Sequence, residues 1–182
     1  FQEVDCVAVL TPNHLHFDMC IDLARAGKRV LCEKPMTITE TDCRLLDELY
    51  PDSIKGVFQL RHNPEIIKLK SELEGAHTGS LIVKVKRDDA YWRSWKGDKD
   101  KSGGLVFNLG IHYLDLLIYL FGNKYTILEH NYSDKLAEGV IDFNGSILTY
   151  YFEAMADAVG QDGVLKIDDS EISLSKQDNL SF

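Results

Sequence analysis

The sequence lacks the patterns that mark metal-binding, disulfide-bonded and nucleic-acid-binding proteins. Its 182 residues include four cysteines with no CxxC pair, and no two histidines have zinc-ligand spacing. Lys and Arg total 20 against 29 Asp and Glu, and the formal net charge of −9 argues against general affinity for nucleic acid. We therefore expect no metal site and no nucleic-acid partner. We expect Cys6, Cys20, Cys32 and Cys43 to be reduced thiols in the core.

The sequence also lacks an unbroken apolar run and an N-terminal signal. The longest apolar helix pattern, residues 105–121, is interrupted by Asn108, His112 and Asp115, which a lipid-spanning helix rarely accepts. No signal peptide opens the chain, which begins without methionine and reaches the strand-like VAVL almost at once. We expect a cytoplasmic protein without a membrane partner, and a chain that continues a longer one.

The first 60 residues alternate short apolar runs with helical patterns. Strands are expected at residues 7–10, 29–32 and 55–60, and helices at 14–27 and 40–50. Thr39 is the expected N-cap of the second helix, with Leu45, Leu46 and Leu49 on its apolar face. Strands separated by helices of this length need crossover connections, so this part predicts a parallel α/β sheet.

The pattern changes after Arg61. A helix is expected at residues 64–74 and a strand at 80–86, followed by a polar loop and the apolar helix 105–121, which Gly122 closes. From residue 125 onward, short alternating runs lie close together with turn residues between them, which predicts an antiparallel sheet. The predicted fold class is α/β: a partial Rossmann sheet in residues 1–61, then an α+β domain with a large, mainly antiparallel open sheet in residues 62–182.

Polar residues follow each of the first three predicted strands. They are Thr11, Pro12, Asn13 and His14 after the first, Glu33, Lys34 and Pro35 after the second, and Gln59 at the end of the third. Ligands of open parallel sheets lie beyond the carboxyl ends of the strands, so these residues are candidates for a binding site. Two plainer interpretations stay open: Glu33 and Lys34 as a surface ion pair, and Asn13 as a helix N-cap.

The apolar helix carries the strongest chemical signal. Asn108, His112 and Asp115 are spaced i, i+4 and i+7, which places them on one face. Unpaired polar groups in a core cost about 1–3 kcal/mol each, so this face needs partners. One alternative is a self-satisfied pair of His112 with Asp115. An imidazole backed by a carboxylate is also how a general base is built.

The loop before this helix is locally basic. Seven Lys and Arg residues lie between Lys84 and Lys101 against four Asp residues, and Tyr91, Trp92 and Trp95 lie among them. Such a loop suits an anionic small molecule whose base or sugar stacks on an aromatic ring. The alternative is a solvated loop with aromatic anchors.

Three segments together resemble one family. VAVLTPNHLH, CEKPMT and GGLVFNLGIHYLDLLIYLFG resemble the glucose-fructose oxidoreductase, inositol dehydrogenase and MocA (Gfo/Idh/MocA) family of nicotinamide-dependent dehydrogenases, over residues 4 to about 152. QLRHNP, YWRSWKGDKDKSGG and NLGIH resemble the branch that oxidises the 3-hydroxyl of UDP-N-acetylglucosaminuronic acid.

The resemblance implies a cofactor, an anionic sugar-nucleotide substrate and a homo-oligomer. NAD is the expected cofactor, with NADP left open, and the open sheet is expected to pack subunits into a dimer or tetramer. Lys34 would contact the nicotinamide ribose and the substrate hydroxyl, and His112 would serve as acid or base. Many relatives carry aspartate at the position of Asn108, so the base here is His112 or Lys34. The implied cofactor contacts are Thr11, Pro12, Asn13, His14, Glu33, Lys34, Pro35 and Gln59. The implied substrate contacts are Arg61, Tyr91, Trp92, Arg93, Ser94, Trp95, Lys96, Asn108 and His112.

The sequence departs from the family at both ends. A complete member would begin with a GxGxxG turn that seats the cofactor pyrophosphate, and no such turn occurs here. We expect about 60 residues to be missing ahead of Phe1, and the family's final helix to be missing after Phe182. Two other functions therefore stay open: a non-catalytic sugar-nucleotide-binding or assembly module, and a dehydrogenase for a free polyol or inositol.

Overall fold

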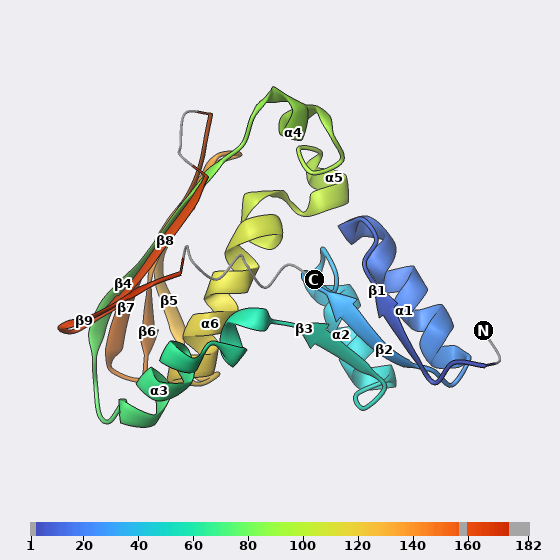
Figure 1. Ribbon diagram of the computed structural model, residues 1–182, viewed down its shortest axis with the longest axis horizontal. Helices are drawn as coiled ribbons and strands as arrows, with labels where there is room; N and C mark the ends of the chain where they lie inside the picture. Colours follow the sequence, from blue (N-terminus) through green and yellow to red (C-terminus); the bar gives the residue numbers. More distant parts are fainter. Residues whose placement is uncertain (1–2, 157–159, 175–182) are drawn as a thin grey trace. The chain divides into compact units, whose positions relative to one another are not determined.

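The computed structural model describes residues 3–156 and 160–174 (Figure 1). The chain divides into two compact units, Phe1–Phe58 with Tyr91–Ile111, and Gln59–Ala90 with His112–Phe182. The chain therefore leaves the first unit after Phe58, returns to it at Tyr91 and leaves it again after Ile111. The predicted division between residues 61 and 62 lies close to the first crossing and misses the return of residues 91–111.

The first unit contains a three-stranded parallel sheet. Its strands are β1 (Cys6–Val9), β2 (Arg29–Glu33) and β3 (Ile54–Val57), in the order β1-β2-β3. Val9 lies opposite Cys32, and Glu33 lies opposite Val57. The predicted parallel sheet is confirmed, and β3 ends before Gln59 because residues Gln59–His62 form a 3-10 turn, η2.

Two helices pack on one face of this sheet. They are α1 (His16–Arg25) and α2 (Glu40–Leu49), and Thr39 caps α2 by accepting a hydrogen bond from the backbone N–H of Asp42. Cys20 and Ile21 of α1 and Leu46 of α2 join one buried cluster with residues of all three strands. The predicted apolar face of α2 is wrong in part, because Leu46 is buried whereas Leu45 and Leu49 are 37% and 50% exposed.

The four cysteines divide by position. Cys20 and Cys32 are fully buried in this cluster, and the Cys32 thiol donates to the carbonyl of Glu33 at 3.3 Å. The neighbouring Cys20 thiol and burial raise the pKa of Cys32. Cys6 and Cys43 are exposed, so the prediction of four core thiols is wrong for these two. All four are free thiols.

The second unit is built on a six-stranded sheet, in the order β5-β6-β7-β4-β8-β9 (Figure 1). The strands are β4 (Thr78–Lys86), β5 (Thr126–Tyr132), β6 (Leu136–Phe143), β7 (Ser146–Met155), β8 (Gln161–Ile167) and β9 (Ser170–Ser173). The central pair β4 and β7 is parallel, and the other four pairs are antiparallel. The predicted mainly antiparallel sheet is confirmed.

One face of this sheet is packed against helix α6 (Ile111–Phe121). Residues along β4 and β7 alternate between buried and accessible, as in Leu81 and Ile82, which gives the sheet an inner and an outer face. On the inner face the rings of Tyr113 and Phe152 lie 6.0 Å apart, and those of Phe121 and Phe143 lie 5.6 Å apart.

A shorter helix, α3 (Pro64–Glu72), precedes this sheet. Asn63 caps it by accepting from the backbone N–H of Glu65, and Pro64 occupies the first helical turn, where its missing N–H costs nothing. Ile66 and Leu69 are buried. By length and composition alone residues 99–121 would also suit a membrane span, a test that the core helix of a globular domain passes equally.

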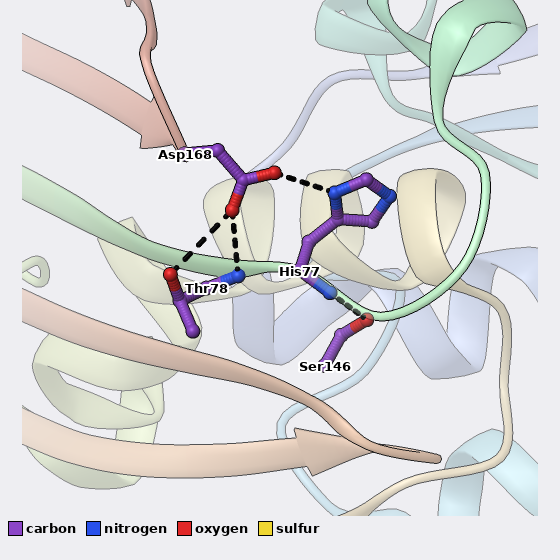
Figure 2. Close-up of polar contacts among 4 residues, drawn as sticks. All are labelled: His77, Thr78, Ser146 and Asp168. Atoms are coloured by element: carbon purple, nitrogen blue, oxygen red, sulfur yellow. Dashed lines mark hydrogen bonds and ion pairs between the residues drawn. The ribbon is translucent and has the colours of Figure 1, made fainter.

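A polar cluster joins three strands at one end of the sheet (Figure 2). The Asp168 carboxylate lies 2.7 Å from Nδ1 of His77 and accepts from the backbone N–H of Thr78 at 3.0 Å. The backbone N–H of His77 donates to Oγ of the buried Ser146. Asp168 has a positive φ of 48°, so the β8–β9 turn folds its carboxylate back onto the start of β4.

Candidate functional site

The carboxyl ends of β1 and β2 bring two polar turns together. Thr11, Pro12, Asn13 and His14 follow β1, and Glu33, Lys34 and Pro35 end β2 and follow it. β1 and β2 are neighbours in the sheet, so these turns lie side by side at one edge. Gln59 belongs to the second unit, so the structure does not group it with the other predicted cofactor contacts.

The turn after β2 is held by its own charged groups. The Glu33 carboxylate accepts from the backbone N–H of Lys34 at 3.0 Å, and the Lys34 ammonium donates to the backbone carbonyl of Asn108 at 2.9 Å. The plainer interpretation of Glu33 and Lys34 as a surface ion pair does not describe these contacts. The lysine is half-buried, and it links two segments that are 74 residues apart.

Asn13 does not cap a helix. Its side chain is 5% exposed and donates to the carbonyl of Ser102 at 2.9 Å, and the 3-10 turn η1 (Asn13–Leu15) has no side-chain cap. Ser102 ends the short helix α5 (Lys99–Ser102), which is thereby fastened to the turn after β1. The neighbouring His14 has a buried Nδ1 with no hydrogen-bond partner among the described residues.

Sequence reasoning missed His16, the first residue of α1. It is 1% exposed, and its two ring nitrogens lie 2.7 Å from the carbonyl oxygens of Thr11 and Pro35. His16 thus touches both polar turns. The sequence does contain an indication of this role, because a histidine follows the TPN turn by three residues. We assigned that histidine only to the helical pattern of residues 14–27.

Asn108 lies in a π-helical segment, η3 (Val106–Gly110). The backbone N–H of Ile111 bonds to the carbonyl of Val106, an i to i+5 spacing that widens the helix, and such segments often occur at functional sites. The Asn108 side-chain amide donates to the hydroxyl of Tyr91 at 2.5 Å. The structure therefore joins Lys34, Tyr91 and Asn108, three predicted site residues, within the first unit.

Two glycines make the turn that leads into this segment. Gly103 and Gly104 have φ of 80° and 78°, which L-residues with side chains rarely adopt. A Cβ on Gly103 would also lie 2.6 Å from the Cβ of Phe107. The glycines thus place η3 close to the end of α5.

His112 and Asp115 lie on α6, in the second unit. His112 is 7% exposed, and its ring meets that of Tyr113 edge to face at 5.5 Å. Asp115 is 8% exposed, and its carboxylate binds the Arg61 guanidinium through both oxygens, with Arg61 Nε 2.7 Å from Oδ2. This pairing raises the pKa of Arg61. The alternative that paired Asp115 with His112 did not include Arg61, which was predicted instead to bind substrate.

The aromatic and basic loop is largely folded. Tyr91, Trp92 and Arg93 lie in a short helix, α4 (Asp89–Arg93), and the hydroxyl of Ser94 donates to the carbonyl of Tyr91. Lys96 lies 5.8 Å from the ring centroid of Trp95. Arg93 and Lys96 are exposed and the three aromatic side chains are half-buried, so the alternative of a solvated loop with aromatic anchors stays open.

The predicted basic patch is divided between the two units. Lys84 and Lys86 lie on β4 in the second unit, with Arg87 directly after them. Arg93, Lys96, Lys99 and Lys101 belong to the first unit, where Lys101 pairs with Asp98 at 3.0 Å. That pairing lowers the pKa of Asp98. Arg93 and Lys96 remain the exposed cations beside the aromatic rings.

A cavity of about 340 Å³ in the first unit lies elsewhere. It runs between α2 and β3, with Met36, Leu46, Tyr50 and Ile54 in its walls, and it includes none of the predicted site residues. It does not contribute to the candidate site.

Two family models match the chain. The model described as "Oxidoreductase family, NAD-binding Rossmann fold" (GFO_IDH_MocA) matches residues 1–57, and "Oxidoreductase family, C-terminal alpha/beta domain" (GFO_IDH_MocA_C) matches residues 76–170. The resemblance stated from the sequence motifs, the α/β fold class and the NAD-binding Rossmann domain are thereby confirmed.

Curated relatives match the chain at about 30% identity. An uncharacterized oxidoreductase of Streptococcus pneumoniae is 33% identical over 131 residues, which are 66% of this chain and 35% of the relative. The scyllo-inositol 2-dehydrogenase (NADP(+)) IolW of Bacillus subtilis is 30% identical over 161 residues, 81% of this chain and 43% of that protein.

Solved structures share the fold over nearly the whole chain. The WlbA (WbpB) dehydrogenase of Thermus thermophilus, crystallised with NAD and UDP-GlcNAcA, is 28% identical with a TM-score of 0.82, covering 94% of this chain and 61% of that one. Levoglucosan dehydrogenase, at 21% identity and a TM-score of 0.80, shows the fold alone. This chain thus spans less than two thirds of the relatives it matches.

Proposed function

Because the chain belongs to the Gfo/Idh/MocA oxidoreductase family, we propose that it carries the nicotinamide and substrate side of a dehydrogenase that oxidises a secondary sugar hydroxyl with NAD. The observation that carries this proposal is the hydrogen bond from the Lys34 ammonium to the Asn108 carbonyl. It joins the CEKP turn to Asn108, and His112 follows Asn108 by four residues in the sequence.

The residues at the ends of β1 and β2 fit the nicotinamide half of the cofactor. They offer a half-buried ammonium on Lys34 and a buried Nδ1 on His14 that has no partner among the described residues. The sequence has no GxGxxG turn for the pyrophosphate. Thr11, Pro12, Asn13, His14, Glu33, Lys34 and Pro35 would therefore hold the nicotinamide and its ribose, with Gln59 as a further contact. When bound, the nicotinamide supplies hydride chemistry.

The protein's own residues would handle the proton and the developing charge. His112 would take the hydroxyl proton through its imidazole, which is the side chain best suited to proton transfer near neutral pH. Lys34 would stabilise the alkoxide, since a positioned cation in a partly dry site stabilises such charge by a few kcal/mol. Asn108 would orient Lys34 through its carbonyl, the contact that the structure provides.

We propose a UDP-linked N-acetylamino sugar uronate, oxidised at C3, as the substrate. The similarity to the Thermus thermophilus WlbA dehydrogenase at 28% identity supports this substrate class. Arg93 and Lys96, beside Trp92 and Trp95, supply exposed cations for its pyrophosphate and carboxylate. Such a substrate belongs to surface-polysaccharide biosynthesis, and a cytoplasmic location would suit it.

Two rival functions are weighed against this proposal. Similarity to the Bacillus subtilis inositol dehydrogenase, over 81% of this chain, favours a free polyol substrate. The other rival is a sugar-nucleotide-binding or assembly module without turnover.

A substrate panel separates these functions. NAD reduction is measured by absorbance with UDP-GlcNAcA and with scyllo-inositol, and binding of each ligand is measured by calorimetry. The proposal expects turnover with the sugar nucleotide. His112→Ala should lower the turnover rate by roughly a hundredfold or more, which is the typical contribution of a general base. His62→Ala, an exposed histidine on η2, is the matched control. Sugar binding without NAD binding would favour the module, and turnover of the inositol alone would favour the polyol.

We also propose that the outer face of the six-stranded sheet joins subunits into a dimer or tetramer. Ile82 is 41% exposed at the centre of this face, beside a groove of about 410 Å³ that Val140, Thr149 and Tyr151 help to line. An exposed apolar surface on a sheet is typical of a subunit contact. Solution mass measurements test this assignment.

A further inference from the structure

His16 connects the two turns of the candidate site. It begins α1, its side chain is buried, and its ring reaches a different turn with each nitrogen. Nδ1 lies 2.7 Å from the carbonyl oxygen of Pro35, and Nε2 lies 2.7 Å from the carbonyl oxygen of Thr11. Both distances lie within the range of charge-assisted hydrogen bonds from nitrogen to oxygen.

The two acceptors around His16 determine whether its ring is neutral or carries a proton on both nitrogens. A neutral imidazole has one N–H donor and one bare nitrogen, whereas a backbone carbonyl can only accept. A neutral His16 would therefore direct the lone pair of one nitrogen at a carbonyl oxygen 2.7 Å away. Both contacts are hydrogen bonds only when both ring nitrogens carry a proton, so the arrangement requires the imidazolium.

Two physical effects oppose a cation at this position. Burial removes water from the charge, and a helix N-terminus repels positive groups. The two short hydrogen bonds offset these effects because they satisfy both donors of the ring. The alternative is also costly, since a buried polar nitrogen facing an acceptor without a proton loses about 1–3 kcal/mol.

The adjoining elements carry several charged groups. Asp18 follows on α1 and His14 precedes in η1, while Glu33 and Lys34 lie in the turn that holds Pro35. The helix α5, which is fastened to η1, and its N-cap add Asp98, Lys99, Asp100 and Lys101. The Glu33 carboxylate binds the backbone N–H of Lys34, and the Lys34 ammonium binds the Asn108 carbonyl. Neither of these two contacts involves His16, whose ring nitrogens meet carbonyl oxygens.

We propose that His16 is a positioning residue that, as an imidazolium, ties the turn after β1 to the turn after β2. Pro35 directly follows Lys34, so holding the Pro35 carbonyl fixes the backbone from which the lysine side chain departs. Thr11 opens the other turn, and its carbonyl is held by the same ring. The effect on cofactor binding rests on the proposed function, whereas the protonation of the ring does not.

The ring protons are measured directly by nitrogen-15 NMR on the wild-type chain. At about pH 7.5 an ordinary histidine, with a pKa near 6.5, is about nine-tenths neutral. The inference expects two protonated ring nitrogens on His16 at this pH, with slow exchange against water. One bare nitrogen on His16 would overturn it.

Variants test the positioning role. His16→Phe keeps a planar ring and removes both donors, and His62→Phe is the matched control at an exposed site. NADH affinity should fall about tenfold in His16→Phe, the size of one lost hydrogen bond to a charged group, and should not change in the control. The amide signal of Lys34 should shift in the same variant. Unchanged NADH affinity with an unchanged Lys34 signal would contradict the positioning role.

The two proposals fail separately. If the wild-type chain does not bind NADH but His16 carries two ring protons, the imidazolium stands and the proposed function is wrong. If the chain binds NADH and His16 has a bare nitrogen, the proposed function stands and the inference is wrong.

Discussion

Single residues act here mainly by joining segments that are far apart in the sequence. Lys34 reaches Asn108, Asn13 reaches Ser102, and Arg61 reaches Asp115. In each case a side chain predicted to face a ligand donates instead to an acceptor on the protein itself. The residue types at the strand ends could be predicted from the TPNH and CEKP patterns. Their partners could not, because hydrogen bonds across 54 to 89 residues depend on the tertiary fold.

The pairing of His77 with Asp168 could not be predicted from the sequence either, because no motif indicated it. His77 holds the pKa of the Asp168 carboxyl below its ordinary range, with a further contribution from the backbone N–H of Thr78. A carboxyl with a lowered pKa in the folded state stabilises the fold above its unfolded pKa, about 3.9 for aspartate. That stabilisation is lost as the pH falls through the lower, folded value.

Asp168→Asn tests this contribution. The variant should unfold at a lower temperature than wild type near pH 7, and the difference should shrink as the pH falls from about 5 toward 3. Thermal melts across this range make the measurement, with Asp169→Asn, the neighbouring residue in the turn, as the control. A difference that stays constant down to pH 3 or so would show that the carboxylate charge does not matter.

At the scale of elements, repeated patterns were predicted well and short elements were not. The three parallel strands follow from apolar runs with helices between them, and the Thr39 cap follows from its position before a helical pattern. The π-helical segment Val106–Gly110 and the short helices α4 and α5 did not stand out. Their residues are polar or apolar in no clear period. The end of α5 is fixed by the hydrogen bond from Asn13 to Ser102, and the start of η3 by the two glycines.

Gly103 gives the sharpest test at this scale. Gly103→Ala should lower the free energy of unfolding by about 2–3 kcal/mol, from the left-handed backbone and from the contact with Phe107. Gly27→Ala is the matched control: its φ is 74°, but no atom lies within 4 Å of the added Cβ, so only about 1 kcal/mol of backbone strain applies.

Urea unfolding of both variants measures these free energies. The difference between them isolates the steric clash between the added methyl group and Phe107. Equal losses for the two substitutions would mean that the turn relaxes around the new methyl group.

At the scale of the whole molecule, the division into two units was only partly predicted. The change of pattern near residue 61 marks the first crossing, because a parallel α/β pattern gives way to an antiparallel one. No change of pattern in the sequence indicates that residues 91–111 belong to the first unit. The loop and the start of the long helix were therefore assigned to the second domain. Their contacts with the turn after β1, through Asn13 and Ser102, assign them to the first unit.

The outer sheet face yields a prediction at this scale. If it joins subunits, the chain should be a dimer or tetramer in solution, and Ile82→Lys should reduce it to a monomer, because a buried unpaired charge destabilises an apolar interface. Ile67→Lys, at a 48% exposed apolar position on α3, is the control and should leave the mass unchanged. Light scattering after size exclusion measures both, and a monomeric wild type would remove the assignment.

The central claim is that this chain holds the nicotinamide half of the cofactor around Lys34. Titration of the chain with NADH and, separately, with its reduced nicotinamide mononucleotide half and its AMP half tests this most directly. The account predicts binding of NADH and of the nicotinamide half, a loss of about tenfold for both in Lys34→Ala, and no change in Lys55→Ala, a surface lysine on β3 whose ammonium binds Pro51. Binding of AMP without the nicotinamide half, or equal affinities in wild type and Lys34→Ala, would contradict it.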